Sequence, residues 1–314
     1  MLRRAVTKFL NDRLIKENIM RMLVATCTMA AVMVLPSLAA ADDAGNSVRA
    51  TLWQPSMNVF RRYGAHAEKM FEFYGPGLGF EQLVTFNPAD AVGGVARFQA
   101  GAQELKLTGR VPDRTYVAGG VRDATGVRLL SFFFASEGEL VRRFEAHGLA
   151  HPVFRTVGDR RSALVTDPDG QSVELVIEPD APAARYREIE VGVTVSDLEE
   201  SRAFYRDFAG LEELPPVHDP LFDTIKYSFR HGATTVSLRS FAGELPADTG
   251  SGGIQYVVSD ADAVDTAAKA HGVVVEKPLT EFSNGALRTI WLEDPDGTTN
   301  YFAETATSRR ARTH

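Results

Sequence analysis

The chain has 314 residues, of which 44% are apolar and 24% charged, as in an ordinary folded protein. This length favours two domains and is ample for burying a hydrophobic core. With 34 basic and 41 acidic side chains, the formal charge is −7. We therefore expect no nucleic-acid partner, since an acidic surface repels phosphates.

Residues 1–41 predict a secretory signal peptide. Six basic side chains precede an apolar run at 22–38, and three alanines follow at 39–41. A basic segment, an apolar core and a small-residue cleavage site are the three parts of such a peptide. The alternative is an uncleaved anchor, but 17 residues in a helix span only about 25 Å, which is marginal for a bilayer. We expect a periplasmic or secreted protein with no stable membrane anchor after cleavage.

Cleavage would change both the thiol content and the charge. The single cysteine, Cys27, lies inside the signal segment, so the mature chain would have no thiol for disulfides, nucleophilic catalysis or metal binding. It would keep 28 basic and 39 acidic side chains, a formal charge of −11.

An internal repeat organises the rest of the chain. Three pairs of motifs recur at offsets of 131, 124 and 127 residues: Phe73-Tyr74 and Phe204-Tyr205, Ala146-His147-Gly148 and Ala270-His271-Gly272, Asp167-Pro168-Asp169-Gly170 and Asp294-Pro295-Asp296-Gly297. Such self-similarity marks duplicated structure. We predict domains at 57–179 and 187–304, a linker at 180–186 and a disordered basic tail at 305–314.

Each half contains two smaller units. An alternating strand at 190–196 leads into Asp197, which is a good N-cap because Glu200 follows three residues later, as in a capping box. A helix at 198–208 and strands at 213–214, 224–229 and 234–239 complete a βαβββ unit. Because Val193-Thr194-Val195-Ser196-Asp197 recurs as Tyr256-Val257-Val258-Ser259-Asp260, we expect four such units in all.

The order and spacing of these motifs resemble the vicinal oxygen chelate superfamily, which contains glyoxalase I, bleomycin-resistance proteins and extradiol dioxygenases. The resemblance covers about residues 55–304. It implies an α+β fold of two tandem glyoxalase-like domains, each a pair of βαβββ units whose eight strands form a cup. It also implies that metal-ligand positions lie on strands one, four, five and eight of each cup.

Carried over one at a time, these positions depart from the family pattern. None of the eight carries histidine: they are Val59, Lys106, Leu129, Glu174, Glu190, Ser237, Gly253 and Tyr301. A catalytic zinc site usually needs three protein ligands, and non-haem iron oxygenases need two histidines and a carboxylate. A dioxygenase is therefore not expected. We assign no cofactor, although the resemblance leaves a divalent metal open.

The sequence is compatible with two pairings of the units. In the ordinary pairing, Lys106 and Glu174 share one cup, whereas Glu190, Ser237 and Tyr301 share the other. In an exchanged pairing, the second unit joins the third and the first joins the fourth, which gathers Glu174, Glu190 and Ser237. Two close carboxylates could hold a metal or shift one another's pKa for proton transfer.

The sequence leaves enzyme and binder as alternatives. The leading hypothesis is an exported protein that binds a small organic molecule and acts on it as a lyase or isomerase. Glu174, Glu190 and Lys106 are its candidate catalytic groups, and Ser237 and Tyr301 are candidate ligand-binding residues. The alternatives are a non-catalytic binding or sequestering protein like the bleomycin-resistance proteins, and a metal-dependent glyoxalase-like lyase. Oligomeric state is not predicted.

Overall fold

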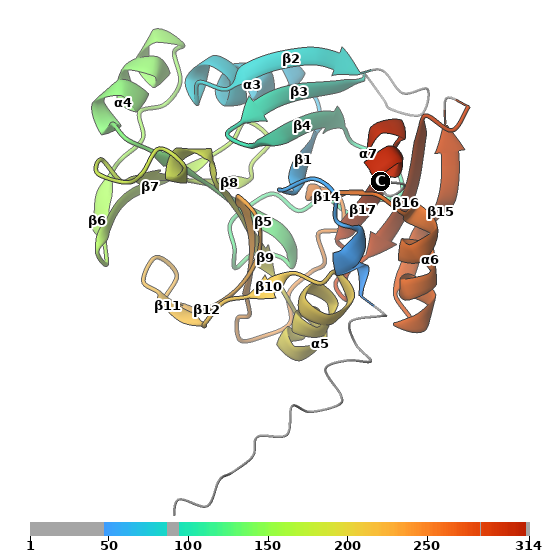
Figure 1. Ribbon diagram of the computed structural model, residues 1–314. Coiled ribbons are helices and arrows are strands. Elements are labelled where there is room, and N and C mark those ends of the chain that lie inside the picture. The colour runs from blue at the N-terminus through green and yellow to red at the C-terminus, as the bar shows by residue number, and fades with distance from the viewer. Residues whose placement is uncertain (1–46, 87–93, 283, 312–314) are drawn as a thin grey trace, which may run out of the picture. The chain divides into compact units, whose positions relative to one another are not determined.

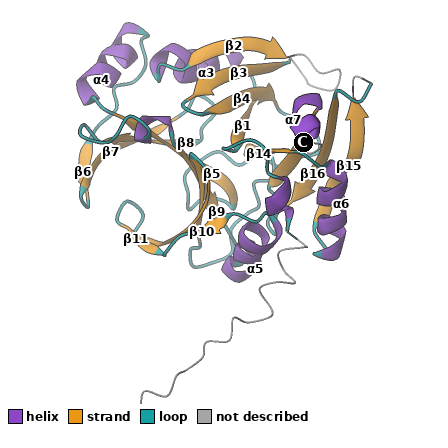
Figure 2. Cartoon of the chain, in the orientation of Figure 1, coloured by secondary structure: helices purple, strands orange, loops and turns teal. Residues whose placement is uncertain are grey.

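The computed structural model describes residues 47–86, 94–282 and 284–311 (Figure 1). The predicted signal peptide, residues 1–41, lies outside this range. Within it, no helix has both the length and the apolar character needed to cross a membrane. The ribbon resolves into four βαβββ units whose strands form two curved sheets (Figure 2).

The first half supplies two units. The elements of the first are β1 (Asn58–Tyr63), α3 (Ala67–Glu72), β2 (Glu81–Phe86), β3 (Val95–Ala100) and β4 (Gln103–Gly109). Those of the second are β5 (Gly126–Phe134), α4 (Glu137–Ala146), β6 (Arg155–Val157), β7 (Arg160–Thr166) and β8 (Ser172–Ile177).

The second half repeats this order. The elements of the third unit are β9 (Ile189–Thr194), α5 (Leu198–Ala203), β10 (Glu212–Glu213), β11 (Val217–Asp219), β12 (Thr224–His231) and β13 (Thr234–Arg239). Those of the fourth are β14 (Gly252–Val258), α6 (Ala261–Ala270), β15 (Val274–Phe282), β16 (Leu287–Glu293) and β17 (Thr299–Thr305). The short strand β11, which pairs with β12, was not predicted.

The units pair in the exchanged way. Strand β5 runs antiparallel to β9, with Ser131 opposite Glu190, and joins units two and three. Strand β1 runs antiparallel to β14, with Phe60 opposite Gly253, and joins units one and four. We call the first sheet the inner cup, because its units are adjacent in sequence, and the second the outer cup. In Figure 1 the inner cup is the ring of strands from β6 to β12.

The repeated motifs tie the units together in the other direction. The helices α3 and α5 each continue into a π-helical turn, η2 (Phe73–Gly77) and η4 (Phe204–Phe208), that buries the Phe-Tyr pair. Tyr74 donates a 2.8 Å hydrogen bond to Asp167, and Tyr205 donates a 2.9 Å bond to Asp294. Strand pairing therefore joins units of different halves, whereas these bonds join the two units of each half.

Local sequence signals explain where the helices begin. Asp197 accepts a 2.9 Å hydrogen bond from the backbone N–H of Glu200, and Ser136 and Asp260 cap α4 and α6 in the same manner. Each such bond satisfies a backbone donor that the helix itself leaves free. Each of the three capping residues follows the end of a strand, so each of these helices begins directly after that strand.

The tail departs from expectation. Residues 305–314 were predicted to be disordered, but Ala306–Ala311 form the helix α7. The cause is a charged contact: Arg309 donates to Glu304, which Arg288 also pairs with at 3.3 Å. Glu304 is only 1% exposed, so the tail cation compensates a buried carboxylate.

Candidate functional site

The exchanged pairing divides the five predicted site residues between the cups. Glu174 on β8, Glu190 on β9 and Ser237 on β13 lie on the concave face of the inner cup. Lys106 on β4 and Tyr301 on β17 lie in the outer cup. The structure thus brings the two glutamates together and separates both from Lys106.

Glu190 is held by three neighbours. Lys226 donates to both carboxylate oxygens, at 3.0 and 2.9 Å, the Ser237 hydroxyl donates at 2.7 Å, and Arg239 donates at 3.2 Å. Burial by itself would raise the pKa of Glu190, but the two cations and the hydroxyl overcome it and hold this pKa at about 2. Glu190 is therefore a permanent anion near neutral pH.

Glu174 has a weaker set of partners. The Ser131 hydroxyl donates to it at 3.0 Å and Arg160 at 2.8 Å, and its side chain is 2% exposed. Burial raises the pKa of Glu174 above its ordinary value; Arg160 opposes this shift and the nearby Glu190 charge adds to it. The pKa values of the two glutamates, Glu174 and Glu190, are thus shifted in opposite directions.

A third carboxylate, Asp219 on β11, links the two glutamates. Arg239 donates to Asp219 from Nε at 2.9 Å and from Nη2 at 2.7 Å, while the same guanidinium also reaches Glu190. Arg160 lies 3.7 Å from Asp219 and pairs with Glu174 on its other side. Three acids thus meet three cations: Glu174, Glu190 and Asp219 with Arg160, Lys226 and Arg239. Buried charges are tolerable only when paired and hydrogen-bonded in this way.

Gly192 on β9 makes room for this network. A Cβ atom there would lie 2.8 Å from the Leu129 Cβ and 3.0 Å from Arg239 Nη1. Both distances are shorter than comfortable contact, so a larger residue would displace the guanidinium. The glycine therefore leaves space for the Arg239 guanidinium, which bonds to both Glu190 and Asp219.

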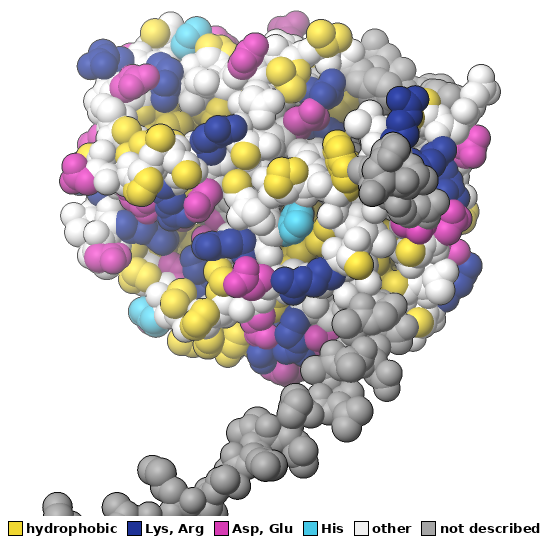
Figure 3. Space-filling model, viewed as in Figure 1, with side chains coloured by type: hydrophobic (Ala, Val, Ile, Leu, Met, Phe, Trp, Pro, Cys, Tyr) yellow, Lys and Arg dark blue, Asp and Glu magenta, His cyan; other side chains and the backbone are white. Residues whose placement is uncertain are grey.

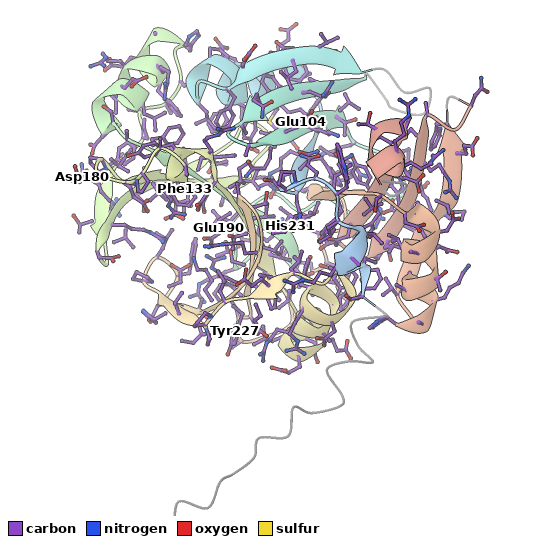
Figure 4. The ribbon with its side chains drawn as sticks, in the orientation of Figure 1. Glu104, Phe133, Asp180, Glu190, Tyr227 and His231 are labelled. Atoms are coloured by element: carbon purple, nitrogen blue, oxygen red, sulfur yellow. The ribbon has the colours of Figure 1, made fainter. Side chains whose placement is uncertain are left out.

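The network opens into a cavity of about 210 Å³. Its wall contains both charged and apolar residues: Phe133, Arg185, Glu188, Ile189, Glu190, Leu214, Pro215, Val217, Lys226, Ser228, Arg230 and Thr235. Figure 4 shows Glu190 and Phe133 on the inner side of the ring, and Figure 3 shows basic and acidic side chains gathered at its opening. The mixture suits a ligand with both polar and apolar parts.

A second, larger cavity of about 330 Å³ lies at the end of β5, beside α4. Phe80, Ala100, Phe132 and Arg143 are in its wall, and none of the eight family ligand positions is. Arg143 is already paired with Glu139 at 2.9 Å. We regard the smaller cavity as the candidate site because it adjoins the buried charges.

The inner cup does not fit a divalent metal. Of its four family ligand positions, Leu129 has no donor atom, and the two glutamates already accept bonds from Lys226, Arg160 and Arg239. A cation would have to displace those charges. Among the described residues, no group of three or more His, Cys, Asp or Glu side chains is arranged to hold a metal ion.

Aromatic rings fill the outer cup. Tyr301 stacks on Trp291 with centroids 4.6 Å apart, and its other neighbour, Phe60, lies at 5.8 Å. A Cβ at Gly253 would meet Phe60 at 2.3 Å, so Phe60 occupies the place of a ligand-position side chain. Lys277 caps the stack, with Nζ 4.3 Å from the centre of the Trp291 ring.

Lys106 lies on the same concave face. It donates to Gln255 and lies 3.7 Å from Glu104, which Arg97 also pairs with (Figure 4 labels Glu104). Burial lowers the pKa of Lys106 to about 8, although the Glu104 charge opposes the shift. Burial also raises the pKa of Tyr301 far above its usual value.

Sequence reasoning missed five members of the network: Ser131, Arg160, Asp219, Lys226 and Arg239. Arg239 follows Ser237 by two residues on one strand, so alternation alone places both on the same face. The same rule places Ser131 beside Leu129. No comparable signal marked Asp219, which lies in a segment that reads as a loop.

Comparison with known proteins agrees with this architecture. Residues 56–175 and 189–302 match the sequence profile of the Glyoxalase/Bleomycin resistance protein/Dioxygenase superfamily. Glyoxalase I from Zea mays is similar in structure, with a TM-score of 0.63 and 20% identity over 82% of this chain and 95% of that one. A putative dioxygenase from Bacillus subtilis subsp. subtilis str. 168 has a TM-score of 0.58 and 14% identity, covering 81% and 86% of the two chains.

At these identities the structural likeness speaks for the fold alone. No curated protein sequence gives a significant match. The profile match covers both halves and well over half of the residues. The chain therefore belongs to the Glyoxalase/Bleomycin resistance protein/Dioxygenase superfamily.

Proposed function

We propose that the inner cup binds a small organic molecule in the cavity beside Glu190 and Lys226. The observation that carries this proposal is the set of six paired charges beside the cavity: Glu174, Asp219 and Arg239 are buried, and Glu190 and Lys226 line the cavity wall. Replacing buried ion pairs with apolar residues is often neutral or stabilising, so such a set is weak evidence for a purely structural role. It does fix the positions of polar groups before a ligand arrives, as a binding site requires.

The second candidate is a lyase or isomerase that uses the same cup. The observation in its favour is the opposite shift of two neighbouring carboxylates, with the pKa of Glu174 raised and that of Glu190 about 2. Paired groups of this kind divide acid and base roles in many enzymes. Glu174 would carry the mobile proton, and Glu190 would stay ionised and orient Lys226. A metal-dependent reaction is not proposed, because the donor set does not fit.

We further propose that the protein acts outside the cytoplasm, on the evidence of residues 1–41. The mature chain would contain no thiol that an oxidising compartment could modify.

A cavity-filling variant tests the binding proposal. Ser228 lines the cavity, so Ser228→Trp should fill it, whereas Thr266→Trp, on the exposed side of α6, serves as the control. A library of small organic molecules is screened against all three proteins by NMR. We expect ligands that bind the unmodified protein and the control but not Ser228→Trp. Ligands that bind all three equally would place binding elsewhere.

Glu174→Gln separates the two candidates. This change keeps the side-chain volume but removes the ionisable group. If the protein is an enzyme, turnover of a ligand found in the screen should be lost while binding is kept. Kept binding with no reaction in either form favours the binder.

A further inference from the structure

The charges that line the inner-cup cavity are unequally compensated. Five charged side chains line it, and four of them are in ion pairs. Arg185 pairs with Glu188 at 2.5 Å and also with Glu178, outside the cavity wall, at 2.8 Å. Lys226 pairs with Glu190 at 2.9 Å. The fifth is Arg230 on β12, which forms no ion pair with any carboxylate in the described ranges.

The acidic residue that faces Arg230 across the strand pairing does not pair with it. Glu212 lies opposite Arg230 in the register of β10 and β12, but its exposed side chain forms no ion pair within the described part of the chain. The cavity therefore has one guanidinium whose charge is free to meet a ligand.

Hydroxyl groups flank this guanidinium. Ser228 precedes Arg230 by two residues and so lies on the same face of β12, and Thr235 lies opposite Arg230 on β13. Both line the cavity and can donate hydrogen bonds to an anionic oxygen. Leu214 and Val217 supply an apolar wall nearby.

We infer that the ligand is a small organic carboxylate with a short apolar body, whose carboxylate pairs with Arg230. The inference rests on the proposed binding function and names its ligand class. A guanidinium matches a carboxylate with two parallel hydrogen bonds, which a neutral amide cannot reproduce. The cavity, at about 210 Å³, is smaller than the roughly 300–1,000 Å³ of drug-sized sites, so the apolar body must be short.

Matched acids and amides test the charge requirement. Butanoate and benzoate, with butanamide and benzamide as neutral counterparts, are titrated into the unmodified protein and into Arg230→Gln by NMR. We expect each acid to bind the unmodified protein at least about tenfold more tightly than its amide, from one charge-assisted interaction. Arg230→Gln should bring this ratio close to one.

Two further proteins make the outcome decisive. Arg142→Gln removes an exposed arginine on α4, away from the cup, and should keep the acid preference. Equal loss in Arg142→Gln and Arg230→Gln, or equal binding of acids and amides to the unmodified protein, overturns the inference. If amides bind the unmodified protein but not Ser228→Trp, the binding function stands without the anion preference. If none of the four compounds binds the unmodified protein, the carboxylate inference is wrong, and the wider screen then decides the binding function.

Discussion

The inner and outer cups are built from the same βαβββ unit, yet their concave faces hold different things. The inner cup carries three carboxylates and three cations beside a cavity that Glu190 and Lys226 line. The outer cup carries a stack of Phe60, Tyr301 and Trp291 across the corresponding positions. A family ligand position can thus be occupied by packed aromatic side chains instead of charged groups. Where a family position carries Glu, its surroundings supply counter-charges, and where it carries Gly253 or Tyr301, aromatic rings fill the space.

The largest difference between the cups should appear when one guanidinium is removed from each. Arg239→Met leaves Asp219 and Glu190 short of a buried partner, and we expect a loss of roughly 3 to 5 kcal/mol in the free energy of unfolding. Arg97→Met in the outer cup removes a side chain that is 32% exposed, so about 0 to 1 kcal/mol is expected. Urea denaturation at pH 7 measures both. Equal losses would show that the inner network is no more interdependent than a surface ion pair.

Adding a single methyl group probes how tightly each cup is packed. At Gly253 the new Cβ would lie 2.3 Å from the backbone oxygen of Thr299, which cannot move without breaking the sheet, so we expect a loss of about 3 kcal/mol. At Gly192 the nearest groups are side chains, and Gly192→Ala should cost roughly 1 to 3 kcal/mol.

The control for these substitutions is Gly138→Ala on α4, where the new Cβ would have no atom within 4 Å apart from its chain neighbours and the backbone of its own helix. Alanine favours a helix over glycine, so this variant should be as stable as the unmodified protein or slightly more stable. If Gly192→Ala behaves like the control, Arg239 has more freedom than the structure implies.

In the described part of the chain, each cup holds a mostly buried lysine, Lys226 in the inner cup and Lys106 in the outer cup. Substitution by methionine should change the stability of the protein in opposite directions at the two positions. Lys226→Met removes the donor to both Glu190 oxygens, and we expect a loss of roughly 1 to 3 kcal/mol at pH 7. Lys106→Met removes a charge that burial disfavours, so a gain of roughly 1 to 2 kcal/mol is expected at pH 7.

The pH dependence gives the sign of the Lys106 effect. Its pKa falls from 10.5 to about 8 on folding, so between these values the unfolded chain binds more protons than the folded one. The unmodified protein should therefore gain stability as the pH rises from 8 to 10.5, and the advantage of Lys106→Met should shrink. Unfolding curves at pH 7 and pH 9.5 measure this. An advantage that does not change with pH would mean that packing, not charge, is responsible.

Much of this architecture could be predicted from sequence because its signals are local. The Phe-Tyr and Asp-Pro-Asp-Gly motifs mark each half, and the structure shows why: Tyr74 bonds Asp167, and Tyr205 bonds Asp294. Which units share a sheet could not be decided, because the first strands of all four units have similar patterns and pairing is a long-range choice.

For the candidate site, too, some residues have a local sequence signal and others are brought in only by the tertiary structure. Glu174, Glu190 and Ser237 could be found from their family positions. Asp219 could not, since a strand of three residues, Val217–Asp219, followed by proline carries no strand signal, and only tertiary structure brings it to Arg239. The sequence therefore indicated where the acids lie but not that cations neutralise them.

The smallest expected effect is that of metal ions on stability. It follows from the neutralisation of Glu174 and Glu190 by the neighbouring lysine and arginines. Glu190 accepts two bonds from Lys226 and one each from Ser237 and Arg239, and Glu174 accepts from Arg160 and Ser131. A divalent ion would gain two carboxylate ligands but would force up to three cations away from buried anions. We therefore expect removal of divalent ions with EDTA, or addition of manganese or zinc, to leave the thermal unfolding midpoint unchanged within error. Elemental analysis of the purified protein should find no stoichiometric metal. A metal present at one ion per chain, and lost in a Glu174→Gln and Glu190→Gln double variant, would show that the acids coordinate a cation and that the lysine and arginines move aside. The double variant is informative only if it folds, which its circular dichroism spectrum establishes first.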